Sequence, residues 1–156
     1  MTEIIQIFSL EKGEECGIYA SMDNFLDDFH RNFVYIHQVT GSPPRIFRFP
    51  GGSINAYNFQ IYEQLIAEML RRGFVYFDWN VSGADLTENA TSESVADTVI
   101  NAVVARKGSS VVLLHDSGSQ ITTKALLPII ETLKARGYEF RVLDNTVVPP
   151  VFAYQS

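Results

Sequence analysis

A histidine and an aspartate follow a short apolar run in the second half of the chain, and they are the first candidates for chemistry. The run is residues 111–114, and His115 and Asp116 come directly after it. Continuous apolar runs of this length, bounded by glycine and serine, are typical of strands buried on both faces in a parallel sheet. Side chains just beyond the carboxyl end of such a strand face the crevice where ligands bind. The pair therefore predicts an acid/base site; in the structural alternative, Asp116 caps the next turn and His115 is a hydrogen-bonded histidine at the rim.

A proline-glycine-glycine turn at residues 50–52 follows the short predicted strand 45–48, which ends at Arg48. Proline makes the entry to the turn rigid, and glycine lacks a Cβ, so main-chain N–H groups can approach a ligand closely. Taken alone, such a turn is weak evidence for a binding site.

The polar segment 78–85 follows another short predicted strand, 74–77, and contains the only tryptophan of the chain, Trp79. Because parallel strands end at the same edge of a sheet, Arg48, this segment and His115 are predicted to share one rim. A cation, a carboxylate and an imidazole from three strands would form an acid/base constellation. The alternative is that polar residues commonly follow strands and converge by chance.

The elements that must position these residues alternate along the chain. Strands are predicted at residues 3–8, 45–48, 74–77, 111–114 and 138–143, with a polar loop at 9–20 and a surface tail at 144–156. Helices are predicted from Ser21 to Gly41, at 59–72, from Thr91 or Ser92 to Gly108, and from Thr122 or Thr123 to Gly137. Pro128 falls inside the last helix, which predicts a kink or a later start. Strict alternation predicts an α/β fold of about five parallel strands and four helices, as an open sheet or a barrel.

Composition limits the class of protein. With 156 residues, 46% of them apolar, the chain is predicted to be a single globular domain, residues 1–156. The formal net charge of −6 and the lack of a Lys/Arg cluster argue against nucleic acid and anionic membranes as partners. Cys16 is the only cysteine, which excludes a disulfide framework. No apolar run is long enough to span a membrane and the first residues resemble no export signal, so the localisation is left undetermined.

Three of these segments, taken in order, resemble motifs of a known family. The third, fourth and fifth motifs of the polysaccharide deacetylases, the NodB-homology family, are similar to Arg48-Phe49-Pro50-Gly51-Gly52-Ser53, to Asp78-Trp79-Asn80-Val81 with Gly83 and Asp85, and to Leu113-Leu114-His115-Asp116. The resemblance covers about residues 18–143. It implies an incomplete, distorted (β/α) barrel with its groove at the carboxyl ends of the strands. It also implies metal-dependent removal of acetyl groups from glycans such as peptidoglycan or chitooligosaccharides, by proteins that generally act outside the cell.

The resemblance implies a catalytic role for each matching residue. Arg48 would pair with and orient the aspartate that acts as the catalytic base, and a main-chain N–H near Gly51 would bind the oxyanion of the tetrahedral intermediate. His115 would be the general acid that protonates the leaving amine, and Asp85 would be the carboxylate that holds and tunes it.

Three further residues are assigned by the resemblance to substrate binding. Leu113 and Trp79 would line the pocket that receives the acetyl methyl group, and Asp78 belongs to the same motif as Trp79. One departure is Leu86 after Asp85, where many members have an Asp-Trp pair.

The larger departure lies before residue 18. The family's first motif is an Asp-Asp pair that supplies the base and a metal ligand, and its second supplies two histidines four residues apart. Neither occurs in this chain, where Ser9 and Gly13 stand roughly where those histidines would be. The family normally uses zinc or another divalent metal, and a hydrolytic zinc takes three protein ligands and an open water position. No metal ligands are identifiable here, because His30 and His37 lie two helical turns apart and are predicted to be surface or partly buried residues.

Together, the resemblance and its missing motifs predict the C-terminal two-thirds of a deacetylase domain, with impaired activity or none. The alternative is a degenerate relative that binds glycan without chemistry. A barrel without its leading strands exposes sheet edges and apolar surface, which predicts a homo-oligomer that covers the gap. An acetylated glycan is the expected ligand of a functional chain.

Overall fold

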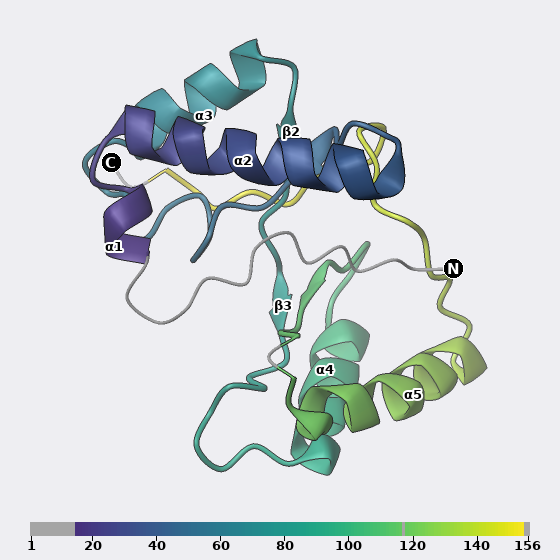
Figure 1. The fold of residues 1–156 in the computed structure, drawn as a ribbon. Helices are drawn as coiled ribbons and strands as arrows, with labels where there is room; N and C mark the ends of the chain where they lie inside the picture. Colours follow the sequence, from purple (N-terminus) through teal and green to yellow (C-terminus); the bar gives the residue numbers. More distant parts are fainter. Residues whose placement is uncertain (1–14, 117, 155–156) are drawn as a thin grey trace. The chain divides into compact units, whose positions relative to one another are not determined.

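The computed structural model describes residues 15–116 and 118–154 of the chain. They form two compact units, residues 79–142 (the 79–142 unit) and residues 15–78 with 143–154 (the 15–78 unit) (Figure 1). The strand predicted at 3–8 lies outside the described residues, and a single domain over residues 1–156 stays a prediction.

The 15–78 unit combines helices with a pair of short parallel strands. Its elements are α1 (Glu15–Ile18), α2 (Met22–Thr40), β1 (Ile46–Phe47), α3 (Tyr62–Arg71) and β2 (Val75–Tyr76). β1 and β2 pair in parallel, with Ile46 opposite Val75 and Phe47 opposite Tyr76. The short helix α1 falls within the segment 9–20, so the prediction that all of this segment is a loop is wrong.

The two ends of α2 confirm the predicted caps. The hydroxyl of Ser21 accepts a hydrogen bond from the N–H of Asn24 at 3.1 Å. Gly41 has a φ of 73°, and its N–H donates to the carbonyl of His37 at 2.9 Å. Both signals act within a few residues, which is why the sequence alone predicts this helix well.

Aromatic packing anchors the segment that carries Arg48. Phe47 meets Phe29 of α2 edge to face, with ring centroids 5.2 Å apart, and its ring lies 4.8 Å from that of Phe49. Phe49 has no exposed surface. Because such ring pairs stabilise beyond their buried area, Arg48 stands between two firmly packed neighbours.

α3 begins at Tyr62 and not at residue 59 as predicted. The main chain before it is held by two asparagines: the N–H of Asn55 donates to Oδ1 of Asn58 at 2.9 Å, and the N–H of Asn58 donates to Oδ1 of Asn55 at 3.1 Å. Such side-chain bonds to the main chain compete with helix formation. The spacing of apolar residues carries no information about these hydrogen bonds. The predicted start of the helix at residue 59 is therefore wrong.

The 79–142 unit contains β3 (Val81–Ser82), α4 (Ser92–Ala105), β4 (Val112–Leu113) and α5 (Gln120–Ala135). β3 and β4 pair in parallel, with Val81 opposite Val112. The buried core of this unit consists of Val81, Val95, Ala96, Val99, Ile100, Val103, Leu114, Ala125, Ile129 and Leu133. None of the described helices is both long and apolar enough to cross a lipid bilayer.

Side-chain caps fix the starts of both helices in the 79–142 unit. Thr91 caps α4 in a capping box, in which Thr91 Oγ1 accepts from Ser94 N–H at 3.1 Å and Thr91 N–H donates to Ser94 Oγ at 2.9 Å. α5 is capped by Ser119 and begins at Gln120, so the predicted start at Thr122 or Thr123 and any later start are wrong. Pro128 stays inside α5 on its exposed side. There, water can bond the carbonyl that proline leaves without a donor.

The strands differ more from the prediction than the helices do. β4 covers only Val112–Leu113, and both residues are partly exposed, which contradicts a strand buried on both faces. The segment 138–143 forms no strand, because Tyr138 and Phe140 pack against the core of α4 and α5 instead. β3 lies inside the segment 78–85 that was predicted to follow a strand. The described strands thus form two separate parallel pairs, and an α/β fold is confirmed without a five-stranded sheet.

Gly83 allows β3 to approach β4 closely. A Cβ at this position would overlap the Leu114 side chain and lie 3.4 Å from Cγ2 of Val99. We expect Gly83→Ala to lower the free energy of unfolding by about 1–3 kcal/mol, as overpacking of a dense core does. Urea denaturation measures the loss, with Gly17→Ala as a control because nothing lies within 4 Å of its added Cβ. An unchanged stability of Gly83→Ala would contradict the described packing.

Candidate active site

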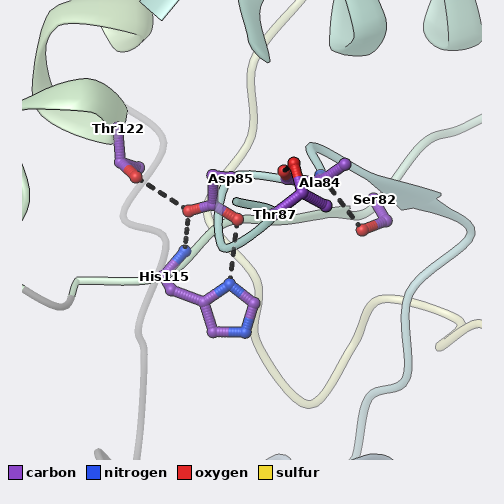
Figure 2. Close-up of polar contacts among 6 residues, drawn as sticks. All are labelled: Ser82, Ala84, Asp85, Thr87, His115 and Thr122. Atoms are coloured by element: carbon purple, nitrogen blue, oxygen red, sulfur yellow. Dashed lines mark hydrogen bonds and ion pairs between the residues drawn. The ribbon is translucent and has the colours of Figure 1, made fainter. Parts of the chain in front are cut away.

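A histidine-aspartate pair lies beyond the ends of β3 and β4 (Figure 2). Nδ1 of His115 is 2.9 Å from Oδ1 of Asp85. Oδ2 of Asp85 accepts two hydrogen bonds, from the N–H of His115 at 2.7 Å and from the hydroxyl of Thr122 at 2.8 Å. The side chain of Asp85 is 1% exposed and that of His115 is 29% exposed. The structure therefore brings two of the predicted catalytic residues together, with the aspartate enclosed and the imidazole open to solvent.

The loop that carries Asp85 contains a strained residue. Ala84 has a φ of 53°, in the left-handed region that costs a non-glycine residue about 1–3 kcal/mol. The carbonyl of Ala84 accepts hydrogen bonds from both the N–H and the hydroxyl of Thr87, at 3.2 and 2.9 Å. These bonds hold the turn that directs Asp85 toward His115 (Figure 2).

Electrostatics keep Asp85 ionised. Burial raises the pKa of the Asp85 carboxyl, but hydrogen bonds from the side chain and main chain of His115 and from Thr122 lower the pKa to below its ordinary value. A carboxylate can only accept, so the proton on the imidazole nitrogen that faces it belongs to Nδ1. Nε2 is then the atom through which His115 gains or gives a proton.

Thr122 is the site residue that sequence reasoning missed. The sequence predicts Thr122 only as a helix start, yet its hydroxyl donates to the Asp85 carboxylate and its side chain is buried. Thr122 lies on the buried face of α5 with Ala125, Ile129 and Leu133. A hydroxyl on an otherwise apolar face needs a buried partner, and this pattern could have identified Thr122 from the sequence.

Replacing Thr122 by valine tests its link to Asp85. The substitution keeps the shape of the side chain and removes one donor, so the pKa of Asp85 should rise toward its ordinary value. NMR titration of the Asp85 carboxyl carbon measures the change. Thr123→Val is the matched control, since Thr123 is exposed on the same helix. An unchanged Asp85 titration in Thr122→Val would rule out the link.

The two residues assigned to the acetyl pocket also lie in the 79–142 unit. Leu113 is in β4, two residues before His115, and Trp79 precedes β3. Both side chains are partly exposed. Their contact with an acetyl group stays a prediction.

In the 15–78 unit, residues 49–53 form a tight turn, the Gly-Gly turn. Gly51 and Gly52 have φ of 73° and 94°, which only glycine adopts without strain. The N–H of Gly52 donates to the carbonyl of Phe49 at 2.8 Å. Within the described part of the chain, no group accepts a hydrogen bond from the N–H of Gly51, which is exposed. The predicted oxyanion donor is thus left available to a ligand.

The remaining predicted residues of the 15–78 unit flank its two strands. Arg48 directly follows β1 and is partly exposed, whereas Asp78 follows β2 and is buried. The pairing of Arg48 with a catalytic base stays a prediction.

The described residues do not fit a divalent metal. Over residues 15–116 and 118–154, no three His, Cys, Asp or Glu side chains are grouped so that they could hold one. His30 and His37 are both exposed on α2, as predicted for surface residues. The site therefore lacks, in the described part of the chain, the ligand set that a hydrolytic metal requires.

Similarity to known proteins points to one family, although no protein-family model matches the chain. The chain is 30% identical over 118 residues to YheN of Bacillus subtilis, which carries the name of a polysaccharide deacetylase; the match covers 73% of this chain and 39% of YheN. It resembles the catalytic domain of a peptidoglycan N-acetylglucosamine deacetylase from Eubacterium rectale, with a TM-score of 0.85, 33% identity and coverage of 91% of this chain and 66% of that one. A polysaccharide deacetylase of Bacillus cereus gives a TM-score of 0.66 and 25% identity, over 81% of this chain and 61% of that one.

The described chain has an α/β fold, and beyond a parallel strand pair it holds a histidine hydrogen-bonded to a buried carboxylate, an arrangement that can transfer protons. These similarities show that the chain belongs to the polysaccharide deacetylase family, the NodB-homology family. It spans less than two thirds of the length of the relatives it matches.

Proposed function

We propose that this chain supplies the proton-transfer part of a polysaccharide deacetylase site. The observation that carries the proposal is the hydrogen bond of 2.9 Å between His115 Nδ1 and Asp85 Oδ1. With Nδ1 held by a carboxylate, Nε2 is the end that reaches a substrate. Water first adds to the carbonyl carbon of the acetamido group; as the carbon–nitrogen bond of the tetrahedral intermediate then breaks, Nε2–H gives its proton to the leaving nitrogen, and acetate and a free amine result.

Asp85 supports this step electrostatically. His115 is a cation before it gives up its proton, and the buried Asp85 carboxylate beside Nδ1 stabilises that cation. Thr122 holds the second oxygen of the carboxylate, so the first stays aligned with the imidazole. We propose His115 as a general acid and not as a nucleophile, because the Asp85 carboxylate beside Nδ1 stabilises the protonated ring from which Nε2–H gives its proton.

The Gly-Gly turn is proposed to stabilise the developing oxyanion. Its Gly51 N–H has no acceptor among the described residues, and a fixed main-chain donor stabilises charge that develops in the transition state. Arg48 is proposed to orient a carboxylate base, as the resemblance to the family implies. The two parallel strand pairs are proposed to belong to an incomplete, distorted (β/α) barrel that has its groove at the strand ends.

The proposed substrate is an N-acetylated glycan of the peptidoglycan or chitooligosaccharide class. The Eubacterium rectale relative is a peptidoglycan N-acetylglucosamine deacetylase by name, and this chain is 33% identical to it. The resemblance to the family implies a divalent metal in such a site, and among the described residues no group of three His, Cys, Asp or Glu side chains could hold it.

The test is acetate release from N-acetylated chitooligosaccharide and from peptidoglycan, with zinc or cobalt added, alongside the metal content of the purified protein by mass spectrometry. Acetate release with stoichiometric metal supports the proposal. No acetate with either metal and either glycan would contradict it.

A second candidate is a non-catalytic glycan-binding protein. It is favoured by the lack of a metal-ligand group in the described part of the chain. Calorimetric binding of chitooligosaccharide that persists in a chelator, without acetate release, would support this candidate. Binding that disappears with the metal would count against it.

A further inference from the structure

Asp78 is a buried carboxylate that the proposed proton transfer does not use. The residue is 1% exposed and lies two positions after the end of β2. Its Oδ1 accepts a hydrogen bond from the N–H of Ser53 at 2.8 Å. Its Oδ2 accepts from the hydroxyl of Ser53 at 2.6 Å and from the N–H of Phe152 at 2.7 Å. One carboxylate thus joins the Gly-Gly turn to a segment near the end of the chain.

The terminal segment is joined to Asp78 a second time. The main-chain N–H of Asp78 donates to the carbonyl of Pro150 at 2.9 Å. Proline restricts the main chain around residues 149–150 to few conformations, so little freedom is lost when this carbonyl and the N–H of Phe152 are held together. The segment 149–152 is therefore bound through both the main chain and the side chain of Asp78, although it was predicted only as a surface tail.

The contacts of Asp78 indicate a supporting role and not contact with substrate. Both carboxylate oxygens are occupied by donors of the protein, and the side chain is closed off from solvent. A buried carboxylate with three such donors would have to give up strong hydrogen bonds to reach a glycan hydroxyl. The geometry therefore favours a role in which Asp78 acts through Ser53 over the predicted contact of Asp78 with substrate.

Several polar groups of the Gly-Gly turn are engaged by the surrounding residues. The carbonyl of Pro50 accepts from the hydroxyl of Tyr19 at 2.8 Å and from Nδ2 of Asn55 at 3.1 Å. The carbonyl of Ser53 accepts from Nδ2 of Asn58 at 3.1 Å. Ser53 N–H donates to Asp78 and Gly52 N–H donates within the turn, whereas the Gly51 N–H has no acceptor among the described residues and belongs to an exposed residue.

We infer that Asp78 is a positioning residue that clamps the Gly-Gly turn to the segment 149–152 and so fixes the direction of the Gly51 N–H. The catalytic part of this inference rests on the proposed function, because the Gly51 N–H matters to the reaction only if it binds the oxyanion. Donors fixed before the reaction need no reorganisation when charge develops, so a loosened clamp lowers kcat more than it changes KM. The clamp itself is a property of the chain that exists with or without catalysis.

Hydrogen exchange of the unchanged chain tests the clamp first. The main-chain N–H groups of Ser53 and Phe152 donate to the same carboxylate. Both should therefore be protected from exchange, and both should exchange through the same local opening of the structure. Exchange of the Phe152 amide at the rate of an unstructured peptide would overturn the inference without any variant. This measurement does not depend on acetate release.

Two variants then test the coupling across Asp78. In Asp78→Asn the side-chain NH2 group faces at least one N–H or O–H donor of the protein, and that hydrogen bond is lost. Protection of the Ser53 and Phe152 main-chain N–H groups should fall by at least about tenfold. Ser53→Ala removes only the hydroxyl bond, and protection of the Phe152 amide, on the other side of Asp78, should fall by about threefold to tenfold. Ser42→Ala, an exposed serine of the same unit, is the control and should change neither amide. If Asp78→Asn fails to fold, the effect of Ser53→Ala on Phe152 decides.

Acetate release by the same variants separates the clamp from its catalytic use. We expect Asp78→Asn to lower kcat by about tenfold or more with KM little changed. Lost amide protection with an unchanged kcat would overturn the positioning role while leaving the proposed function intact. No acetate from the unchanged chain, with both amides protected, would instead overturn the proposed function and leave the clamp as a purely structural device. Unchanged Phe152 protection in both variants would overturn the inference altogether.

Discussion

Replacing His115 by alanine is expected to lower acetate release by at least about 100-fold, the usual contribution of a positioned general acid. The amine that leaves an acetamido group is a poor leaving group unless it is protonated. His115 is the only histidine of residues 79–142, because the other two, His30 and His37, lie in the 15–78 unit, and its Nε2 is the ring nitrogen that Asp85 does not hold. Steady-state release of acetate from N-acetylated chitooligosaccharide, with zinc or cobalt supplied, measures the effect.

The control for this substitution is His37→Ala, because His37 is exposed on α2. It should release acetate at the rate of the unchanged chain. Circular dichroism of both variants checks that the fold is kept, which is expected because the His115 side chain is partly exposed. A His115→Ala chain that keeps more than about a tenth of the activity would exclude His115 as the general acid.

The helices of this chain were predicted better than its strands, and the reason is physical. A helix is specified by signals a few residues apart: the Ser21 cap and Gly41 define α2, and Thr91 with Ser94 defines the start of α4. A strand is defined by a partner far away in the sequence. The apolar run 111–114 has only Val112–Leu113 in a ladder, because its partner is the short strand Val81–Ser82.

The candidate site shows the same division between local and distant information. The residues around His115 and Asp85 resemble family motifs, and so the pair could be identified from the sequence. Their hydrogen bond joins residues 30 positions apart and depends on the turn at Ala84, which no local pattern predicted. Thr122 and the Asp78 clamp were missed because each acts through a partner in another segment.

Replacing Asp85 by asparagine is expected to reverse the tautomer of His115. Two donors, the His115 N–H and the Thr122 hydroxyl, point at Oδ2, so the amide oxygen of asparagine must occupy that position. The amide nitrogen then faces Nδ1 and donates to it, and the imidazole proton moves to Nε2. Nitrogen NMR shifts of the His115 ring distinguish the two tautomers. A ring that keeps its proton on Nδ1 in Asp85→Asn would contradict the hydrogen bonding described for the pair.

The same substitution should lower acetate release by about 100-fold to 10,000-fold, because the cationic imidazole loses its carboxylate partner and the neutral ring has the wrong tautomer. It should also lower the free energy of unfolding by about 1.5–3 kcal/mol, the value of a hydrogen bond to a charged group. Asp97→Asn, exposed on α4, is the control. Acetate release that stays within about tenfold of the unchanged chain would contradict the supporting role of Asp85.

The stability effect of Asp85→Asn depends on pH in a direction that the structure fixes. The pKa of Asp85 is lower in the folded chain than its ordinary value of 3.8, so the folded chain binds this proton less readily than the unfolded chain. The carboxylate therefore contributes its full stabilisation above the unfolded pKa and loses it as the pH falls through the folded pKa. Urea denaturation between pH 7 and about pH 3 should show the two chains converging in stability only at the acidic end. A stability difference that grows as the pH falls would mean that the pKa of Asp85 is raised by burial and not lowered by His115 and Thr122.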